Sequence, residues 1–197
     1  MIRILGLTVF ALTYGMNSAI ALSAMTPLCS ATESTQTGDA AFARFNQAVA
    51  NYLSLVQRLH REVPELRVTD KSAEISNRSD MLAGAIQRAR AGATQGDFFD
   101  AATARLIRER LAAALQREDV ASLLKGINDE PILKAPPGVH LRFPVAASLA
   151  TMPSRLLKAL PPLPKELEYR FVGRTLVLRD RDAALILDYV PDALPKP

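Results

Sequence analysis

"LEYRFVGRTLVLRDRDAALILDYV", residues 167–190, is the stretch of this chain that best predicts its fold. Apolar and polar residues alternate along it, with interruptions at Gly173-Arg174 and at Asp180–Ala183. Alternation with a period of two is typical of β-strands. Glycine at the first position of a two-residue turn accepts the positive φ that a tight hairpin requires. We therefore expect a three-stranded antiparallel β-meander over residues 167–190.

The two-residue turn fixes the register of the first two strands, because a slip by one residue would move every side chain to the opposite face. The expected pairs are Val172 with Thr175, Phe171 with Leu176, Tyr169 with Leu178, and Glu168 with Arg179. A four-residue turn at Asp180–Ala183 extends the pattern to the third strand. The expected pairs there are Leu185 with Leu178 and Leu187 with Leu176. One face of this sheet is apolar, and it needs a partner surface to be stable.

The opposite face of the sheet combines aliphatic and charged side chains. The residues of interest on this face are Arg170, Val172, Val177, Ile186 and Asp188. One interpretation is an exposed face that carries the β-branched residues that strands favour. The other is a docking face for a second envelope protein, or for a second copy of this chain that adds a strand at an open edge.

A helical region precedes the sheet. Apolar residues recur in steps of three and four at Phe42, Phe45, Val49, Tyr52, Val56, Leu59 and Val63. That spacing predicts one long helix, which Pro64 ends. A second helix is expected from about Ser72 to Ala91, and a third over FFDAATARLIRERLAAALQRE, capped by Asp97 or Asp100. Short connections between the three favour a small antiparallel bundle.

The residues from 129 to 166 are rich in proline, which excludes a long helix or a central strand. One short helix is expected from Pro153 to Leu160, because proline suits the first helical turn. The rest is expected to wrap over the bundle in extended form. Its apolar residues are expected to hold it to the core, and they are Leu133, Val139, Leu141, Phe143 and Val145.

The fold class expected is therefore α+β, with a three-helix antiparallel bundle, a proline-rich wrapping segment and a C-terminal meander that packs on the bundle. We expect a single domain over 41–197. Its helical part covers 41–128, its proline-rich segment 129–166 and its meander 167–190. An aliphatic core is expected, since the 197-residue chain has no tryptophan and only 6% aromatic residues.

The N-terminus is typical of a secretory signal peptide over residues 1–21. Arg3 is followed by an apolar run without charge, and Ala19-Ile20-Ala21 offers the small residues that signal peptidase recognises. Cleavage near Ala21 implies a periplasmic or secreted protein, with a flexible linker over 22–40. The alternative is a retained anchor in the inner membrane, and only in that case is a membrane a partner.

The lone cysteine, Cys29, allows a free thiol or an intermolecular disulfide and excludes an internal one. The net charge of +4 comes from basic residues interleaved with acidic ones, so nucleic acid is not expected as a partner.

Motifs for enzymatic chemistry are scarce. His60 is expected at the boundary of the apolar stripe, and His140 has no cysteine or carboxylate at metal-binding spacing, so no metal or cofactor is expected. Asp180 and Asp182 form the best carboxylate pair and could serve a hydrolase, although Arg179 and Arg181 alternate with them. Aspartate is also a favoured turn residue. The pattern favours a non-enzymatic binding or accessory protein, with the hydrolase as the alternative.

The C-terminal sequence LPPLPKELEYRFVGRTLVLRDRDAALILDYVPDALP resembles the end of a group of uncharacterised secreted bacterial proteins, in which a proline-bounded segment of this type closes the chain. The resemblance covers about the last forty residues. It implies export and a bacterial source, and it carries no catalytic residue across.

Overall fold

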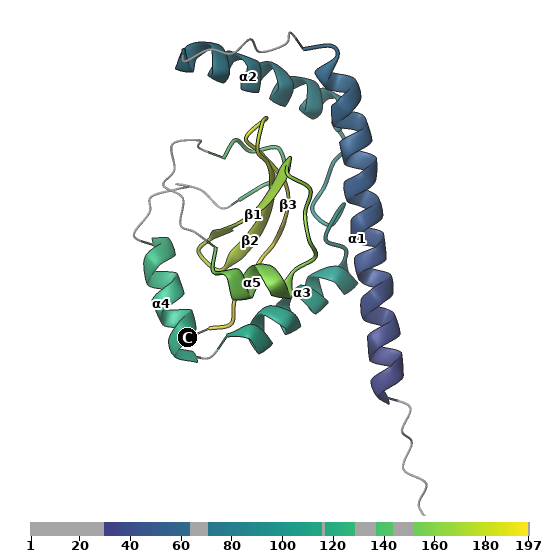
Figure 1. Cartoon of the computed structure of the whole chain (residues 1–197), viewed down its shortest axis with the longest axis vertical. Coiled ribbons are helices and arrows are strands. Elements are labelled where there is room, and N and C mark those ends of the chain that lie inside the picture. The colour runs from purple at the N-terminus through teal and green to yellow at the C-terminus, as the bar shows by residue number, and fades with distance from the viewer. Residues whose placement is uncertain (1–29, 64–70, 116, 129–136, 144–151, 197) are drawn as a thin grey trace, which may run out of the picture.

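The computed structural model describes residues 30–63, 71–115, 117–128, 137–143 and 152–196. It has a mixed helix-and-sheet fold (Figure 1). The helices are α1 (Ser30–His60), α2 (Ser72–Ala89), α3 (Ala101–Ala114), α4 (Arg117–Asn128) and α5 (Ser154–Ala159). The strands are β1 (Leu167–Val172), β2 (Thr175–Asp180) and β3 (Leu185–Val190), and they form one antiparallel sheet in the order β1-β2-β3.

The register of β1 and β2 is the predicted one. All four expected pairs are present, from Val172 with Thr175 to Glu168 with Arg179. Gly173 has a φ of 56°, which is the positive value that the first position of the turn requires. This hairpin was predictable because its turn and its alternation are both local features of the sequence.

The predicted register of β2 and β3 is wrong. Leu185 pairs with Asp180, and the register shifts between Leu178 and Arg179, so that Asp188 lies opposite Leu178. The turn occupies residues 181–184 in place of 180–183, and Ala184 adopts a φ of 48°. An extra residue in one strand is a β-bulge, which re-aims the side chains beyond it. The bulge therefore changes which face Asp188 occupies.

Helix α1 begins earlier than expected. Its first residue is Ser30, so the described part of the expected linker, residues 30–40, is helical. A Cβ atom at Gly38 would lie 3.4 Å from the Leu106 side chain of α3. The Thr103 hydroxyl donates a hydrogen bond to the Ala41 carbonyl at 3.2 Å. Close contact with α3 thus supports α1 on the N-terminal side of the predicted apolar stripe.

The apolar stripe of α1 forms one wall of the core, as its spacing predicts. Six of its seven residues are buried, and Phe42 packs against the core from its edge. The Phe45 and Phe99 rings stack with their centroids 5.4 Å apart, and Phe99 in turn stacks on Tyr169 of β1 at 6.5 Å. Aromatic pairs at such separations add to the free energy gained by burial. This stack joins α1 to the sheet.

The expected bundle is found only in part. Helix α1 packs against α2 and α3, and α3 packs against α5. Figure 1 shows α2 crossing near the C-terminal end of α1 and α3 crossing nearer its N-terminus, with the sheet between them. The third predicted helix ends earlier than expected, at Ala114, because Leu115 takes an extended conformation. Helix α4, which begins at Arg117 and extends to Asn128, was not predicted as a separate helix. Asp100 caps α3 as expected, with its carboxylate accepting from the Thr103 N–H at 2.7 Å.

The segment 137–143 lies along the outer edge of β3. The His140 N–H donates to the Ile186 carbonyl at 2.8 Å, and the Ile186 N–H donates to the Leu141 carbonyl at 3.0 Å. Phe143 is buried against the sheet as expected, whereas Leu141 is 45% exposed. Val139 is half-buried, and Leu133 and Val145 lie outside the described residues. The short helix expected at Pro153–Leu160 is confirmed as α5.

Candidate functional site

The predicted docking face is not an open surface in this structure. Val177, Ile186 and Asp188 each have an exposed fraction of 0%. Val177 and Ile186 form a small second core with Phe143, against which Val172 packs. Arg170 is paired with Glu168 at 2.7 Å, with 18% of its side chain exposed. Phe143 packs on this face and its central residues are buried, so we do not propose it as a docking site.

Asp188 has a different role from the one expected, because the β3 bulge turns its carboxylate toward the loop before α3. The Phe98 and Phe99 N–H groups both donate to Oδ2 at 2.8 Å. The Gly96 N–H donates to Oδ1 at 3.0 Å, and the Tyr189 N–H donates to the same oxygen at 2.8 Å. A buried carboxylate is tolerated when several donors surround it. Asp188 therefore ties this loop to the sheet, a role that no local pattern in the sequence indicates.

The carboxylate pair, Asp180 and Asp182, is divided between two environments. Asp180 is 1% exposed, and its carboxylate accepts from the Tyr52 hydroxyl at 2.8 Å and from the Ala183 N–H at 2.7 Å. Asp182 is on the surface, with its Oδ2 3.9 Å from Nε2 of His60. A general acid must touch its substrate. The burial of Asp180 favours the turn-forming role that aspartate often has.

Burial raises the pKa of the Asp180 carboxyl above its ordinary value of 3.8, while the hydrogen bonds from Ala183 and Tyr52 oppose that shift. The folded chain thus binds this proton more tightly than the unfolded chain. Asp180 therefore contributes fully to the free energy of unfolding below pH 3.8, its ordinary pKa. That contribution is lost as the pH rises through the higher pKa of the folded chain. Burial and the nearby Asp180 also raise the pKa of the Tyr52 hydroxyl, which stays neutral.

We expect Asp180→Asn to remove this pH dependence. The amide can accept from the Ala183 N–H and donate to the Tyr52 oxygen, so both contacts persist without a buried charge. At pH 4 the variant and the parent should have similar free energies of unfolding, and at pH 7 the variant should be the more stable one. Urea unfolding at the two pH values measures the difference. A variant that loses stability as the pH rises, in parallel with the parent, would contradict this assignment.

Neither histidine is placed as a metal ligand. Nδ1 of His60 lies 3.0 Å from Nη2 of Arg78. His140 has a φ of 65°, and burial together with the nearby Arg90 lowers its pKa. No group of three or more metal-ligating side chains occurs within the described ranges. Cys29 and residues 1–21 lie outside those ranges, so the expectations for them stay predictions.

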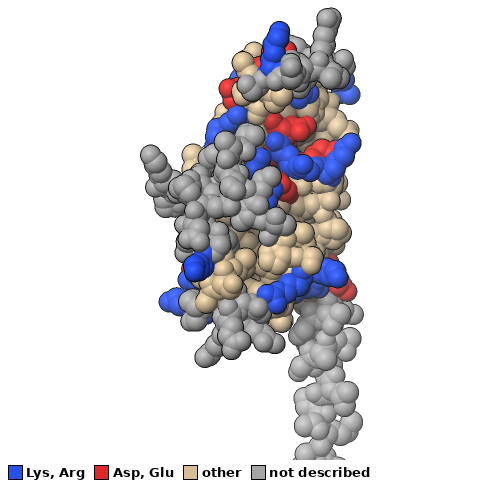
Figure 2. Space-filling view, turned by 60° about the vertical axis from the view of Figure 1, so that its left-hand side comes forward, with Lys and Arg blue, Asp and Glu red and all other residues tan. Residues whose placement is uncertain are grey.

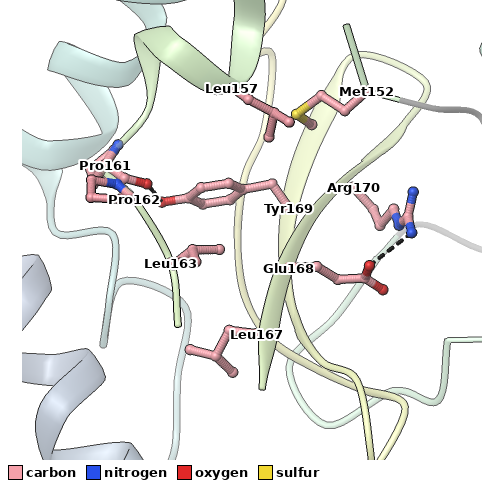
Figure 3. Close-up of a pocket in the computed structure, with 9 residues that line it drawn as sticks. All are labelled: Met152, Leu157, Pro161, Pro162, Leu163, Leu167, Glu168, Tyr169 and Arg170. Atoms are coloured by element: carbon pink, nitrogen blue, oxygen red, sulfur yellow. Dashed lines mark hydrogen bonds and ion pairs between the residues drawn. The ribbon is translucent and has the colours of Figure 1, made fainter. Parts of the chain in front are cut away.

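Within the part of the chain that the structure describes, a pocket of about 500 Å³ lies between α5 and β1 (Figure 3). We call it the α5–β1 pocket, and it is lined by Met152, Leu157, Pro161, Pro162, Leu163, Leu167, Glu168, Tyr169 and Arg170. Pockets of 300–1,000 Å³ with mostly apolar walls and a few polar groups are typical of ligand sites. A second hollow, of about 300 Å³ beside α2, includes Glu62, Asp80 and Arg88 in its lining.

The apolar wall of the pocket comes from α5 and the segment that follows it. In Figure 3 the Tyr169 ring extends from β1 to Pro161, and its hydroxyl donates to the Pro161 carbonyl at 3.1 Å. That bond fixes the ring across the pocket. Leu157 is 47% exposed, which makes it one of four large apolar side chains on the described surface. An exposed leucine beside a pocket is a contact surface available to a partner.

The charged rim of the pocket lies on the other side of β1. Glu168 binds Arg170 at 2.7 Å and lies 3.1 Å from Nε of Arg179, and all three side chains are largely buried. Burial lowers the pKa of Arg179 while Glu168 opposes the shift. The Arg179 guanidinium also lies 4.8 Å from the centroid of Phe143. These contacts hold the rim in one arrangement, which is what a preorganised binding site needs.

Charge elsewhere on the surface is mixed. On the face shown in Figure 2, Lys and Arg side chains are interspersed with Asp and Glu in the upper part, and the middle is mostly uncharged. No described helix has the length and apolar character to cross a membrane.

No family model, curated protein or solved structure matches the sequence or fold of this chain. Function is therefore inferred from the geometry of the site itself.

Proposed function

We propose that this chain is an exported, non-enzymatic binding protein of a bacterial cell envelope, and that the α5–β1 pocket is its ligand site. The geometry of the pocket is the observation that supports this proposal. It combines a volume suited to a ligand, an apolar wall and a fixed charged rim formed by Glu168 and Arg170. None of the lining groups is a nucleophile next to a base, so binding without turnover is the chemistry that they support.

The rest of the fold acts as a scaffold in this proposal. Helix α1 supports the meander through the stack of Phe45 on α1, Phe99 in the loop before α3, and Tyr169 on β1. Tyr169 also reaches the pocket, so the same stack supports the ring that crosses it. A site on a rigid strand is held more closely than one on a loop.

Export is proposed from residues 1–21, which have the features of a signal peptide, and from the resemblance of the C-terminal segment. We expect the mature protein purified from its own cell envelope to begin at Leu22. Intact-mass spectrometry reports that residue directly. A chain that still begins at Met1 would favour the alternative, a protein anchored by residues 2–22.

A glutamate in the apolar wall of the pocket should weaken the binding of an apolar probe. We expect Leu157→Glu to weaken the binding of N-phenyl-1-naphthylamine, a neutral fluorescent molecule, by at least about tenfold, which corresponds to about 1.4 kcal/mol. The reason is that a charge placed beside the probe must be desolvated when the probe binds. Fluorescence titration of the full-length protein measures the dissociation constant.

Ile75→Glu is the matched control, because Ile75 is also a helical residue with an exposed fraction of 47% and does not line the pocket. The control should bind the probe as the parent does. If the two variants bind the probe equally well, the α5–β1 pocket is not the ligand site.

A further inference from the structure

The main chain of β1 offers hydrogen-bonding groups to the α5–β1 pocket. Successive residues of a strand point to opposite faces, so a pocket that contacts residues 167–170 in a row lies along the edge of the strand. The order β1-β2-β3 makes β1 an edge strand. The pocket thus runs beside main-chain atoms as well as side chains.

The hairpin determines which residues direct their main chain toward this edge. A two-residue turn is closed by a hydrogen-bonded pair, here Val172 with Thr175, and such pairs recur at every second residue. The Arg181 N–H donates to the Glu166 carbonyl at 2.9 Å, in agreement with that alternation. Even-numbered residues of β1 therefore bond to β2, and the main chain of Tyr169 points away from β2.

The two main-chain groups of Tyr169 have no partner among the described residues, whereas the neighbouring Leu167 N–H donates to the Pro164 carbonyl at 3.1 Å. Tyr169 is 5% exposed. A largely buried donor or acceptor without a partner destabilises a fold. A ligand that supplies both an acceptor and a donor would remove that penalty.

We propose that the ligand of the α5–β1 pocket is an extended polypeptide segment that adds to the edge of β1 and pairs its main chain with the N–H and C=O of Tyr169. This inference rests on the proposed function and deepens it. A lipid tail or another purely apolar molecule could fill the pocket but would leave both Tyr169 groups unpaired. A peptide main chain carries a donor and an acceptor on each residue, so it satisfies both.

The pocket also indicates the pattern of the segment. Side chains of an added strand alternate between the two faces of the sheet. One of them enters the apolar part beside Leu157 and Leu163, and the next lies over the face that carries Glu168. We therefore expect a segment in which an apolar residue is followed by a polar one. Leu167 limits the pairing at one end, since its N–H is already bonded within the chain.

The test begins with a phage-displayed library of random seven-residue peptides, selected on the full-length protein and counter-selected on Leu157→Glu. The selected peptides are synthesised, and each main-chain amide is N-methylated in turn. An N-methyl group removes a donor and leaves the side chain unchanged. If the segment adds to β1, methylation should weaken binding by at least about tenfold at the amide that donates to the Tyr169 carbonyl, and it should have little effect at the two amides beside it, which point away from β1.

Three outcomes would overturn the inference. The first is a set of peptides whose affinity is insensitive to N-methylation at every position, which would mean that only side chains are recognised. The second is a library that yields no binder while N-phenyl-1-naphthylamine still binds, which would leave the proposed function in place with a non-peptide ligand. The third is the absence of binding by both peptides and probe, which would overturn the proposed function as well.

Discussion

Lysine in place of Val177 or Ile186 is expected to destabilise the fold strongly. Both side chains have an exposed fraction of 0% and pack against Phe143 in the second core. A lysine there must place an ammonium group among aliphatic side chains or force Phe143 away. We expect each substitution to reduce the free energy of unfolding by more than about 4 kcal/mol, out of a typical 5–15 kcal/mol for a domain.

Urea unfolding followed by circular dichroism measures this effect. Leu141→Lys is the control, because Leu141 lies in the segment that covers the same face and is 45% exposed. That control should change the free energy of unfolding by less than about 0.5 kcal/mol. A folded Val177→Lys variant with the unfolding midpoint of the parent would show that the outer face of the sheet is open, as the sequence alone predicts.

Asp188→Asn is expected to be strongly destabilising, although it is a conservative substitution. The main-chain N–H groups of Gly96, Phe98 and Phe99 all point at this carboxylate. In the asparagine variant, an NH2 group would replace one carboxylate oxygen. This NH2 group would then face main-chain N–H groups, which are also donors, so no hydrogen bond could form. Because the substitution removes charge-assisted hydrogen bonds in a buried site, we expect the free energy of unfolding to fall by about 3 kcal/mol.

Asp180→Asn provides the contrast, since it is the same change at another buried aspartate and is expected to be stabilising at pH 7. Unfolding of the two variants in urea at pH 7 compares them directly. Amide hydrogen exchange should also be faster at Phe98 and Phe99 in Asp188→Asn than in the parent. Equal effects of the two substitutions would contradict the different roles assigned to Asp180 and Asp188.

The elements that sequence could predict are those with local signals. The hairpin of β1 and β2 follows from Gly173 and the alternation around it, and the α1 stripe follows from its spacing. The short helix α5 follows from Pro153 and the apolar residues after it. In each case the residues that determine the element lie within the element itself.

The register of β3 depends on contacts that are distant in sequence. The bulge brings Asp188 to the amides of Gly96 and Phe98, about 90 residues earlier in the chain. No local pattern specifies this pairing. The part of α1 around Gly38 and Ala41, which the sequence predicts as the end of a linker, is likewise supported by α3. Tertiary contacts thus override the polar composition that favours a linker.

A signal for the buried outer face was present in the sequence. Leu185, Ile186 and Leu187 are consecutive apolar residues, and such a run is typical of a strand that is buried on both faces. The α5–β1 pocket had no comparable signal. Its walls come from α5, from Pro161–Leu163 and from β1, and only the path of the chain between them brings these together.

The central claim is that the edge of β1 at the pocket binds an extended segment, and amide hydrogen exchange by NMR, with and without a selected peptide, tests it most directly. We expect exchange at Tyr169 to slow by at least about tenfold when the peptide is bound, because its N–H gains a partner. The amides of Glu168 and Arg170 face β2 and should change little. Unchanged exchange at Tyr169 in a protein saturated with peptide would contradict the claim.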